Sequence, residues 1–374
     1  MWLLLGGGGG ELEKLPARTP DPSGLAEGSP RDAPALLEEL PLPGLLPQVR
    51  SGAPNTEPFQ RGRVHWARDG GEGPPARAGA DLVYDPRREV LVLFGGLSES
   101  GAFLADTWER SAAGWRACAQ GSAPPPRRAH LMAYHGKLKR LVLFGGSSLR
   151  EGYLGDTWLY DGKGWKQHRG AGPSPRSHFG LTYDGARGQV VLFGGRTRRS
   201  RGNRHGYLGD TWVFDERGWR EVRARSPSPR RNHALAYDPE RQRVVLFGGF
   251  ALKRDAAGRM SSPHVAETWE WDGSGWTQRK LARKPSPRRV PGAMVYDPRR
   301  RAIVLFGGNQ ERRHLNDVWS YDGSSWTSLP ARNPPQGRDW VATAFDGLRQ
   351  RVVVFGGDVQ TSLGEEPTRD AWEF

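Results

Sequence analysis

The tripeptide Phe-Gly-Gly occurs six times at nearly regular steps, and this repeat constrains the fold more than any other feature. Its phenylalanines are Phe94, Phe144, Phe193, Phe247, Phe306 and Phe355. The steps between them are 50, 49, 54, 59 and 49 residues. A self-similar period of this length is typical of an array of small units, each of which buries its apolar face only against its neighbours.

A constant spacing in front of the repeat predicts a first β-hairpin. An aromatic residue lies ten residues before each phenylalanine, at Tyr84, Tyr134, Tyr183, Tyr237, Tyr296 and Phe345. Turn sequences such as Asp-Pro-Arg-Arg and β-branched runs such as Arg-Val-Val-Leu-Phe lie between the two positions. This pattern indicates a strand A, a polar turn and a strand B of fixed length.

Tryptophans mark a second hairpin in each unit. An acidic residue followed two positions later by tryptophan comes after each Phe-Gly-Gly, with the tryptophans at Trp108, Trp158, Trp212, Trp269, Trp319 and Trp372. In five units another tryptophan follows seven residues later, at Trp115, Trp165, Trp219, Trp276 and Trp326. Glycine-containing turns between them indicate strands C and D, whose indoles supply large apolar surfaces for packing between sheets.

The missing outer tryptophan of the sixth unit is found at the other end of the repeat region. Trp66 precedes Tyr84 by 18 residues, and Trp165 and Trp219 precede the next strand-A tyrosines by the same distance. We therefore expect the strand around Trp66 to pair with the strand around Trp372. This pairing closes the array into a ring and removes its open ends.

Double glycines, a downstream aromatic, a final tryptophan and a period near 50 together resemble kelch repeats over residues 61–374. The resemblance implies an all-β fold, namely a six-bladed kelch-type β-propeller with four antiparallel strands per blade. Residues 1–60 lack sustained periodicity and are rich in proline, glycine and acid. We expect them to form a mostly disordered tail.

Charge is unevenly distributed, and this bears on the partner. The net charge is +14, but residues 1–58 carry four basic and eight acidic residues, so the remainder carries +18. An excess of arginine favours a protein or another anionic polymer as partner. Sequence-specific DNA binding is not expected, because no helix for a groove is indicated. No apolar run is long enough to span a bilayer, and we expect a monomer.

Six arginines form a further repeat, seven residues before each strand-A aromatic: Arg77, Arg127, Arg176, Arg230, Arg289 and Arg338. They could form a ring of guanidinium groups around a central mouth, suited to carboxylate or phosphate. Alternatively, each could pair with the acidic residue of the same blade. The sequence favours this structural role, because a contact repeated in every blade serves what the blades share.

Function is expected where the repeat breaks. The positions five and four residues before the strand-A aromatic vary, and the most chemically capable residues there are His130, His178, His233 and Trp340. The long loop after the third Phe-Gly-Gly holds five arginines, Arg196, Arg198, Arg199, Arg201 and Arg204. These nine residues are the candidate binding residues. We expect no metal and no cofactor, because no cysteine or carboxylate stands at ligand spacing from the histidines.

The sequence thus favours a non-catalytic kelch-repeat scaffold that recognises a protein or other anionic partner through its arginine-rich loop face. The alternative is a sugar-acting enzyme, similar to sialate mutarotases or to galactose oxidase, with its site in the central mouth. No catalytic residue is assigned. The compartment stays open, although the single cysteine, Cys118, and the lack of a convincing signal peptide favour the cytoplasm.

Overall fold

The computed structural model describes residues 60–374 except 120, 200–203 and 363. All the regular structure in these residues is β-strand. The predicted tail, up to residue 59, and Arg201 lie outside the described residues. No helix in the described part of the chain has the length and apolar character needed to cross a membrane.

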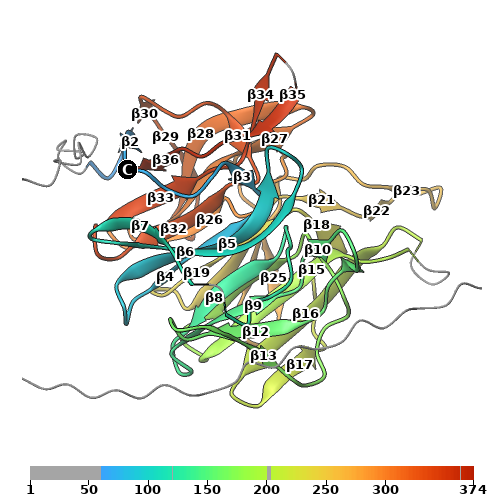
Figure 1. Cartoon of the computed structure of the whole chain (residues 1–374). Coiled ribbons are helices and arrows are strands. Elements are labelled where there is room, and N and C mark those ends of the chain that lie inside the picture. Colours follow the sequence, from blue (N-terminus) through green and yellow to red (C-terminus); the bar gives the residue numbers. More distant parts are fainter. Residues whose placement is uncertain (1–59, 120, 200–203, 363) are drawn as a thin grey trace, which may run out of the picture. The chain divides into compact units, whose positions relative to one another are not determined.

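The strands form six antiparallel sheets, each with the order A–B–C–D that the two hairpins predict (Figure 1). We number these blades from 1 to 6. Blade 1 contains β4 (Asp81–Asp85), β5 (Val90–Ser98), β6 (Phe103–Ser111) and β7 (Gly114–Ala117). Blade 2 contains β8 (Leu131–His135), β9 (Arg140–Phe144), β12 (Thr157–Tyr160) and β13 (Trp165–His168). Blade 3 contains β14 (Gly180–Asp184), β15 (Gln189–Arg196), β16 (Tyr207–Asp215) and β17 (Gly218–Val222).

The remaining blades repeat this order. Blade 4 contains β19 (Ala234–Asp238), β20 (Arg243–Phe247), β24 (Thr268–Trp271) and β25 (Trp276–Arg279). Blade 5 contains β26 (Met294–Asp297), β27 (Ala302–Gln310), β28 (Arg313–Tyr321) and β29 (Trp326–Leu329). Blade 6 contains β32 (Ala342–Asp346), β33 (Arg351–Phe355), β36 (Ala371–Glu373) and β2 (Ala67–Asp69).

Shorter strands extend the blades at the end where strand B runs into strand C. They are β3 (Arg77–Ala78), β10 (Ser147–Ser148), β11 (Gly152–Tyr153), β18 (Arg230–Arg231), β21 (Phe250–Ala251), β22 (Lys253–Arg254), β23 (Met260–Ser261), β31 (Arg338–Asp339), β34 (Asp358–Thr361) and β35 (Gly364–Pro367). Two others, β1 (Val64–His65) and β30 (Ala331–Arg332), pair in parallel beside blade 6.

The sheets close into a ring, as the sequence predicts. Each strand A packs beside the strands A of its two neighbours, in the order β4, β8, β14, β19, β26, β32 and back to β4. In blade 6, β2 pairs antiparallel with β36, so that Arg68 lies opposite Trp372. Figure 1 shows the C-terminus next to β2 and β36. Trp66 packs edge-on against Phe374 with the ring centroids 4.5 Å apart, which reinforces the closure.

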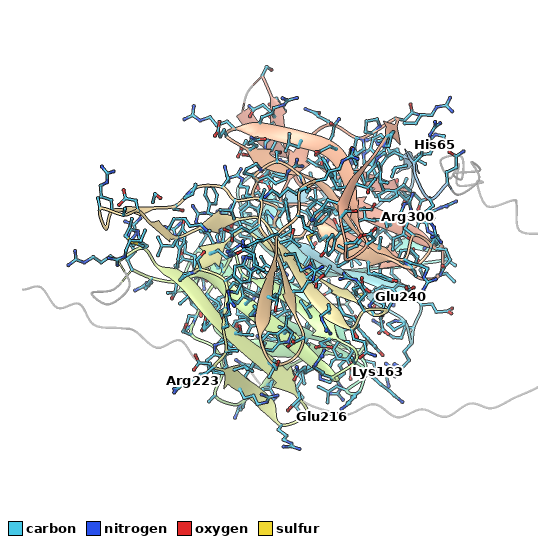
Figure 2. All side chains as sticks on the ribbon, turned by 180° about the vertical axis from the view of Figure 1, so that it is seen from behind. His65, Lys163, Glu216, Arg223, Glu240 and Arg300 are labelled. Carbon is cyan, nitrogen blue, oxygen red and sulfur yellow. The ribbon has the colours of Figure 1, made fainter. Side chains whose placement is uncertain are left out.

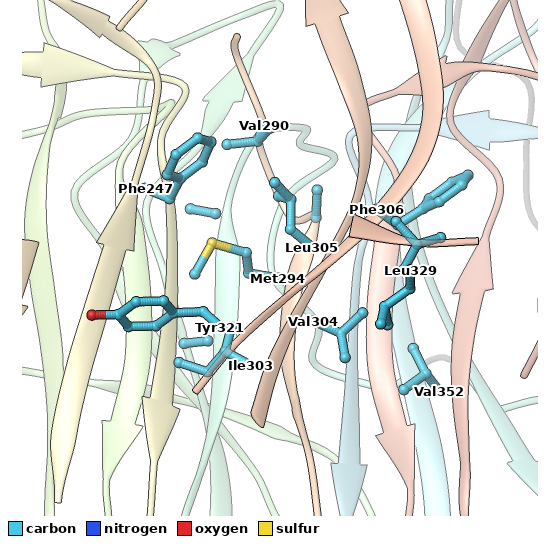
Figure 3. Packing of buried hydrophobic residues seen from close by; sticks show 14 of the residues in the cluster. Phe247, Val290, Met294, Ile303, Val304, Leu305, Phe306, Tyr321, Leu329 and Val352 are labelled. Carbon is cyan, nitrogen blue, oxygen red and sulfur yellow. The ribbon is translucent and has the colours of Figure 1, made fainter. Parts of the chain in front are cut away.

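One aromatic pair joins every blade to the next. The strand-D tryptophan of each blade packs on the Phe-Gly-Gly phenylalanine of the preceding blade, with ring centroids 4.9–5.5 Å apart. The six pairs are Trp66–Phe306, Trp115–Phe355, Trp165–Phe94, Trp219–Phe144, Trp276–Phe193 and Trp326–Phe247. Aliphatic side chains such as Met294 and Leu305 fill the space around such pairs (Figure 3). Burial of this apolar surface is the main stabilising term between blades.

The glycine pair of the repeat is required where adjacent blades meet. Gly145 and Gly146 have φ angles of +60° and +99°. A Cβ atom on Gly145 would lie 2.8 Å from the carbonyl oxygen of Arg176 in the next blade. The N–H group of Gly146 donates a hydrogen bond of 2.9 Å to that same carbonyl. Only glycine satisfies both the backbone conformation and the close approach.

A hydroxyl group satisfies the indole N–H of most strand-D tryptophans. In four blades the indole N–H donates to a threonine hydroxyl of the preceding blade, at 2.9–3.0 Å. This threonine lies between the acidic residue and the strand-C tryptophan of that blade. Blade 5 has Val318 at this position. The indole Nε1 of Trp66, which packs on blade 5, is buried without a hydrogen-bond partner in the described part of the chain.

Val318→Thr should therefore stabilise the protein by about 1 kcal/mol, because the new hydroxyl gives a buried, unpaired donor its acceptor. The free energy of unfolding, measured by denaturant titration, tests this. Val92→Thr is the matched control, since the tryptophans of its cluster, Trp158 and Trp165, already have partners. The control should be destabilised, and an equal loss in both variants would contradict the assignment.

Candidate functional site

The repeated arginine is a buried structural group in every blade. Arg127 illustrates its contacts: its two terminal nitrogens each lie 2.7 Å from an oxygen of Asp156. Nη1 also donates to the carbonyl of Gly145, and Nε donates to the carbonyl of Pro125. The six arginine–carboxylate pairs are Arg77–Asp106, Arg127–Asp156, Arg176–Asp210, Arg230–Glu267, Arg288–Asp317 and Arg338–Asp370. These arginine side chains are at most 2% exposed, so they do not face a ligand.

In blade 5 the sequence prediction chose the wrong arginine. Arg288, and not Arg289, forms the buried pair with Asp317. The segment Arg-Arg-Val-Pro-Gly-Ala-Met-Val-Tyr of blade 5 is one residue longer than Arg-Arg-Asn-His-Ala-Leu-Ala-Tyr of blade 4. Counting back from the strand-A tyrosine therefore misses the paired arginine by one. Arg289 instead forms a salt bridge with Asp339 of blade 6.

The carboxylates of these pairs have pKa values below the usual range. Burial alone raises the pKa of Asp370, but the hydrogen bonds and charge of Arg338 outweigh it and lower the pKa to about 2. Glu267 behaves in the same way: Arg230 and Lys253 overcome burial and lower its pKa to about 2. The ionised pair is the folded form at neutral pH.

Arg230→Met should lower the free energy of unfolding by about 3 kcal/mol, because Glu267 is left buried with only part of its charge compensated. Arg231→Met is the matched control at the next position, and its side chain makes no salt bridge within the described residues. We expect the control to unfold at nearly the denaturant concentration of the wild type. Unchanged stability of Arg230→Met would refute the structural role.

Acid should weaken the fold through the same pairs. Their carboxylates bind protons more weakly in the folded state than in the unfolded chain, where an aspartate has a pKa of about 3.9. The stabilisation of the fold by these pairs is therefore complete above the unfolded-state pKa and is lost as the pH falls toward 2. We expect Asp370→Asn to reduce the slope of unfolding free energy against pH between about 4 and 2. Glu216→Gln, at an exposed position, should keep the wild-type slope.

The residue next to the buried arginine belongs to a different environment. In each blade it forms an antiparallel bridge with the residue that follows Phe-Gly-Gly. The six bridges are Ala78–Leu97, Arg128–Ser147, Ser177–Arg196, Arg231–Phe250, Arg289–Asn309 and Asp339–Asp358. These twelve residues, with His178 and Trp340, are called the mouth below. Most mouth positions carry different residue types in different blades.

Arginines of blades 2, 3 and 4 form the basic half of the mouth. Arg128, Arg196 and Arg231 make no salt bridge with any described residue. Arg231 lies over the ring of Phe250 at 4.4 Å, and its Nε donates a 2.8 Å hydrogen bond to the hydroxyl of Tyr207. These contacts orient the guanidinium of Arg231 without neutralising its charge, and Arg128 lies over the ring of Phe103 at 5.4 Å.

His178 reports how closely these groups converge. Burial lowers its pKa first, and Arg231, Arg128, Arg196 and Arg289 then lower it further, to about 3. The imidazole is therefore neutral at physiological pH. Its ring meets the indole of Trp340 edge-on at 5.1 Å, so two of the predicted binding residues do come together at the mouth.

A ring of backbone hydrogen bonds forms the floor of the mouth. The residue two positions after the buried arginine donates its backbone N–H to the carbonyl of the equivalent residue in the preceding blade, as from Ala129 to Gly79 and from Asn232 to His178. The ring is interrupted between blades 5 and 6, where the N–H of Trp340 donates instead to Oδ1 of Asp339 at 2.9 Å. Below the floor, the A strands enclose a channel of about 300 Å³ that Asp81 and the strand-A tyrosines line.

The other two predicted histidines are buried. His130 and His233 are 1% exposed and pack edge-on against Phe94 and Phe193 between blades, so they are not available to a large partner. His130 lines a small pocket together with His178 and Trp340, whereas His233 lines the channel that the A strands enclose. Arg198, Arg199 and Arg204 are exposed beyond the mouth. Among the described residues, no group of three His, Cys, Asp or Glu side chains is placed to hold a metal ion.

The geometry of Cys118 bears on the galactose-oxidase-like alternative. Its Sγ lies 3.6 Å from the hydroxyl of Tyr160, next to Glu109, where the outer strands of blades 1 and 2 meet. This pair is not part of the central mouth. The mutarotase-like alternative needs only a few polar groups in the mouth and stays a prediction.

Several mouth residues were missed from the sequence, although a simple signal marks them. Arg128, Arg231 and Asp339 each follow the buried arginine directly, and Phe250 and Asp358 each follow Phe-Gly-Gly directly. The positions singled out from the sequence start one residue later and lie largely at the floor. The residue before the floor is charged in four of the six blades.

Comparison with known proteins agrees with the fold. Residues 59–215 and 112–255 match the model of the KLHDC2/KLHL20/DRC7 Kelch-repeats domain. Together these matches cover just over half of the chain, so the chain belongs to the kelch-repeat family. Kelch domains are protein-interaction scaffolds, and the match indicates the same general role here. A search of curated proteins found no match.

Proposed function

We propose that this chain is a non-catalytic scaffold whose mouth binds an acidic segment of a partner protein. The observation that carries the proposal is that Arg128, Arg196 and Arg231 stand at the mouth bridges of three adjacent blades and make no salt bridge with any described residue. Guanidinium groups held by aromatic rings bind carboxylates with little loss of conformational entropy.

The opposite face of the blades is also rich in arginine, but there one arginine in each of five blades is paired. In five blades an aspartate at the end of strand A forms a salt bridge with the arginine three residues later, in the A–B turn. These pairs are Asp85–Arg88, Asp184–Arg187, Asp238–Arg241, Asp297–Arg300 and Asp346–Arg349. Five arginines of this face are thus held in pairs within their own turn, whereas Arg128, Arg196 and Arg231 stand together on adjacent blades without a salt bridge to any described residue, which favours the mouth for an anionic partner.

The outer edges of the blades carry charges of both signs, as Glu216 and Arg223 of blade 3 illustrate (Figure 2). Glu216 lies 3.8 Å from Lys137 of the neighbouring blade. The exposed Arg198, Arg199 and Arg204 instead continue the basic half of the mouth along the loop after β15. They extend the surface over which an acidic segment is attracted.

A direct binding measurement tests the proposal. The probe is a fluorescein-labelled octapeptide with glutamates alternating with glycine, titrated with the full chain at low salt and followed by anisotropy. Arg128→Ala combined with Arg231→Ala should weaken binding about tenfold or more, and raising the salt should weaken wild-type binding.

Arg223→Ala is the control, because Arg223 is an exposed arginine on an outer edge. It should change the affinity little. If both variants lose the same affinity, only the total charge matters and the mouth is not the site.

A further inference from the structure

The mouth is divided into two halves of opposite charge. Its basic half lies on blades 2, 3 and 4. Its acidic half lies on blade 6, where Asp339 and Asp358 face each other in the bridge between β31 and β34. Glu365 of β35 pairs with Gln360 of the same hairpin and extends the acidic half outward. Arg289 of blade 5 lies between the halves.

The acidic half is only partly neutralised. Nε of Arg289 lies 2.5 Å from Asp339, and its Nη2 lies 3.6 Å from Glu365. Asp358 makes no salt bridge with any described residue. Burial, and then repulsion from Glu365, raise its pKa to about 6, although Arg128 and Arg289 oppose this shift. Three carboxyl groups, those of Asp339, Asp358 and Glu365, thus surround the single guanidinium of Arg289 at this edge, so acidic groups outnumber the cation.

An unpaired donor lies beside the boundary between the halves. Asn309 is 3% exposed, and its side-chain nitrogen has no hydrogen-bond partner in the described part of the chain. Asn309 is the bridge partner of Arg289, so the two side chains lie on the same face of that ribbon. The amide nitrogen is as buried as the side chains of His130 and His233, so it lies beneath the boundary and does not itself contact a partner.

We propose that the segment bound in the mouth carries charges of both signs, with its acidic residues against the basic half and a lysine or arginine against Asp358 and Glu365. This inference deepens the proposed function and rests on it. A purely anionic segment would bring like charge against blade 6, whereas a mixed segment satisfies both halves. The division also fixes the direction in which the segment lies across the mouth.

The test compares three labelled octapeptides with the full chain, by anisotropy at constant salt. The first has two glutamates in a glycine–serine background, and the other two replace one serine by lysine, three or five residues from the nearest glutamate. At least one lysine peptide should bind about threefold more tightly than the acidic peptide. The net positive charge of the protein alone predicts the opposite result, namely weaker binding of the lysine peptides.

Two variants locate the effect. Glu365→Gln and Asp358→Asn should remove the gain from lysine while leaving the affinity for the acidic peptide equal or higher. Glu216→Gln is the matched control, since Glu216 and Glu365 are 47% and 46% exposed, and it should keep the gain.

The outcomes separate the two proposals. If the acidic peptide binds but lysine lowers its affinity, or if the gain survives in both mouth variants, the mixed-charge inference is overturned and the proposed function stands. If none of the peptides binds, the proposed function fails, and this inference fails with it.

Discussion

The buried arginine–carboxylate pair is the interaction on which the rest of the structure depends. In blade 2, the guanidinium of Arg127 ties the loop before strand A to the carbonyl of Gly145 and to Asp156 at the start of strand C. The same carboxylate accepts the indole N–H of Trp158, and the carbonyl of Arg127 accepts the N–H of Gly96 from the preceding blade. One side chain thus connects strands A, B and C within a blade, and its backbone carbonyl connects that blade to the preceding one. Four of its five N–H donors have partners inside the blade and the side chain is buried, so the group does not face a ligand.

Because the buried arginine does not face a ligand, contacts to a partner are left to the residue beside it. The neighbouring residue, Arg128, is held by backbone hydrogen bonds to Ser147, so its position is fixed whatever its side chain is. A rigid backbone that does not depend on side-chain identity allows arginine, serine, alanine or aspartate at equivalent positions. The buried arginine therefore stabilises the blade, and the residue that follows it is available for recognition. Residue types at the mouth can differ between blades while the packing beneath stays the same.

Much of the architecture follows from the sequence, because it depends on spacing that the hairpins keep constant. The strand order, the closure around Trp66 and Trp372 and the pairing of the repeated arginine were predicted on this basis. Prediction failed where a count crossed an insertion, as with Arg289, and where polarity was taken for exposure, as with His130 and His233. The mouth bridges could not be predicted, because they depend on the positive φ angles of the glycine pair, which redirect the chain after strand B. Local context, Pro-Ser-Pro-Arg, marks the paired arginine of blade 5 better than distance does.

The extra residue of blade 5 accounts for more than a shift in numbering. It coincides with the one break in the floor among the described residues, where the N–H of Trp340 meets no carbonyl from blade 5. Asp339 supplies the missing acceptor, which draws its carboxylate down into a buried position beside Arg289. An unsatisfied backbone donor is costly, so an acceptor side chain at this place offsets the gap in the ring. Burial disfavours the ionised form and raises the pKa of Asp339 to about 7, although the charge of Arg289 and the N–H of Trp340 oppose this shift. The inserted residue of blade 5 therefore accounts for the acceptor role of Asp339 in a ring that elsewhere is held together by its own backbone.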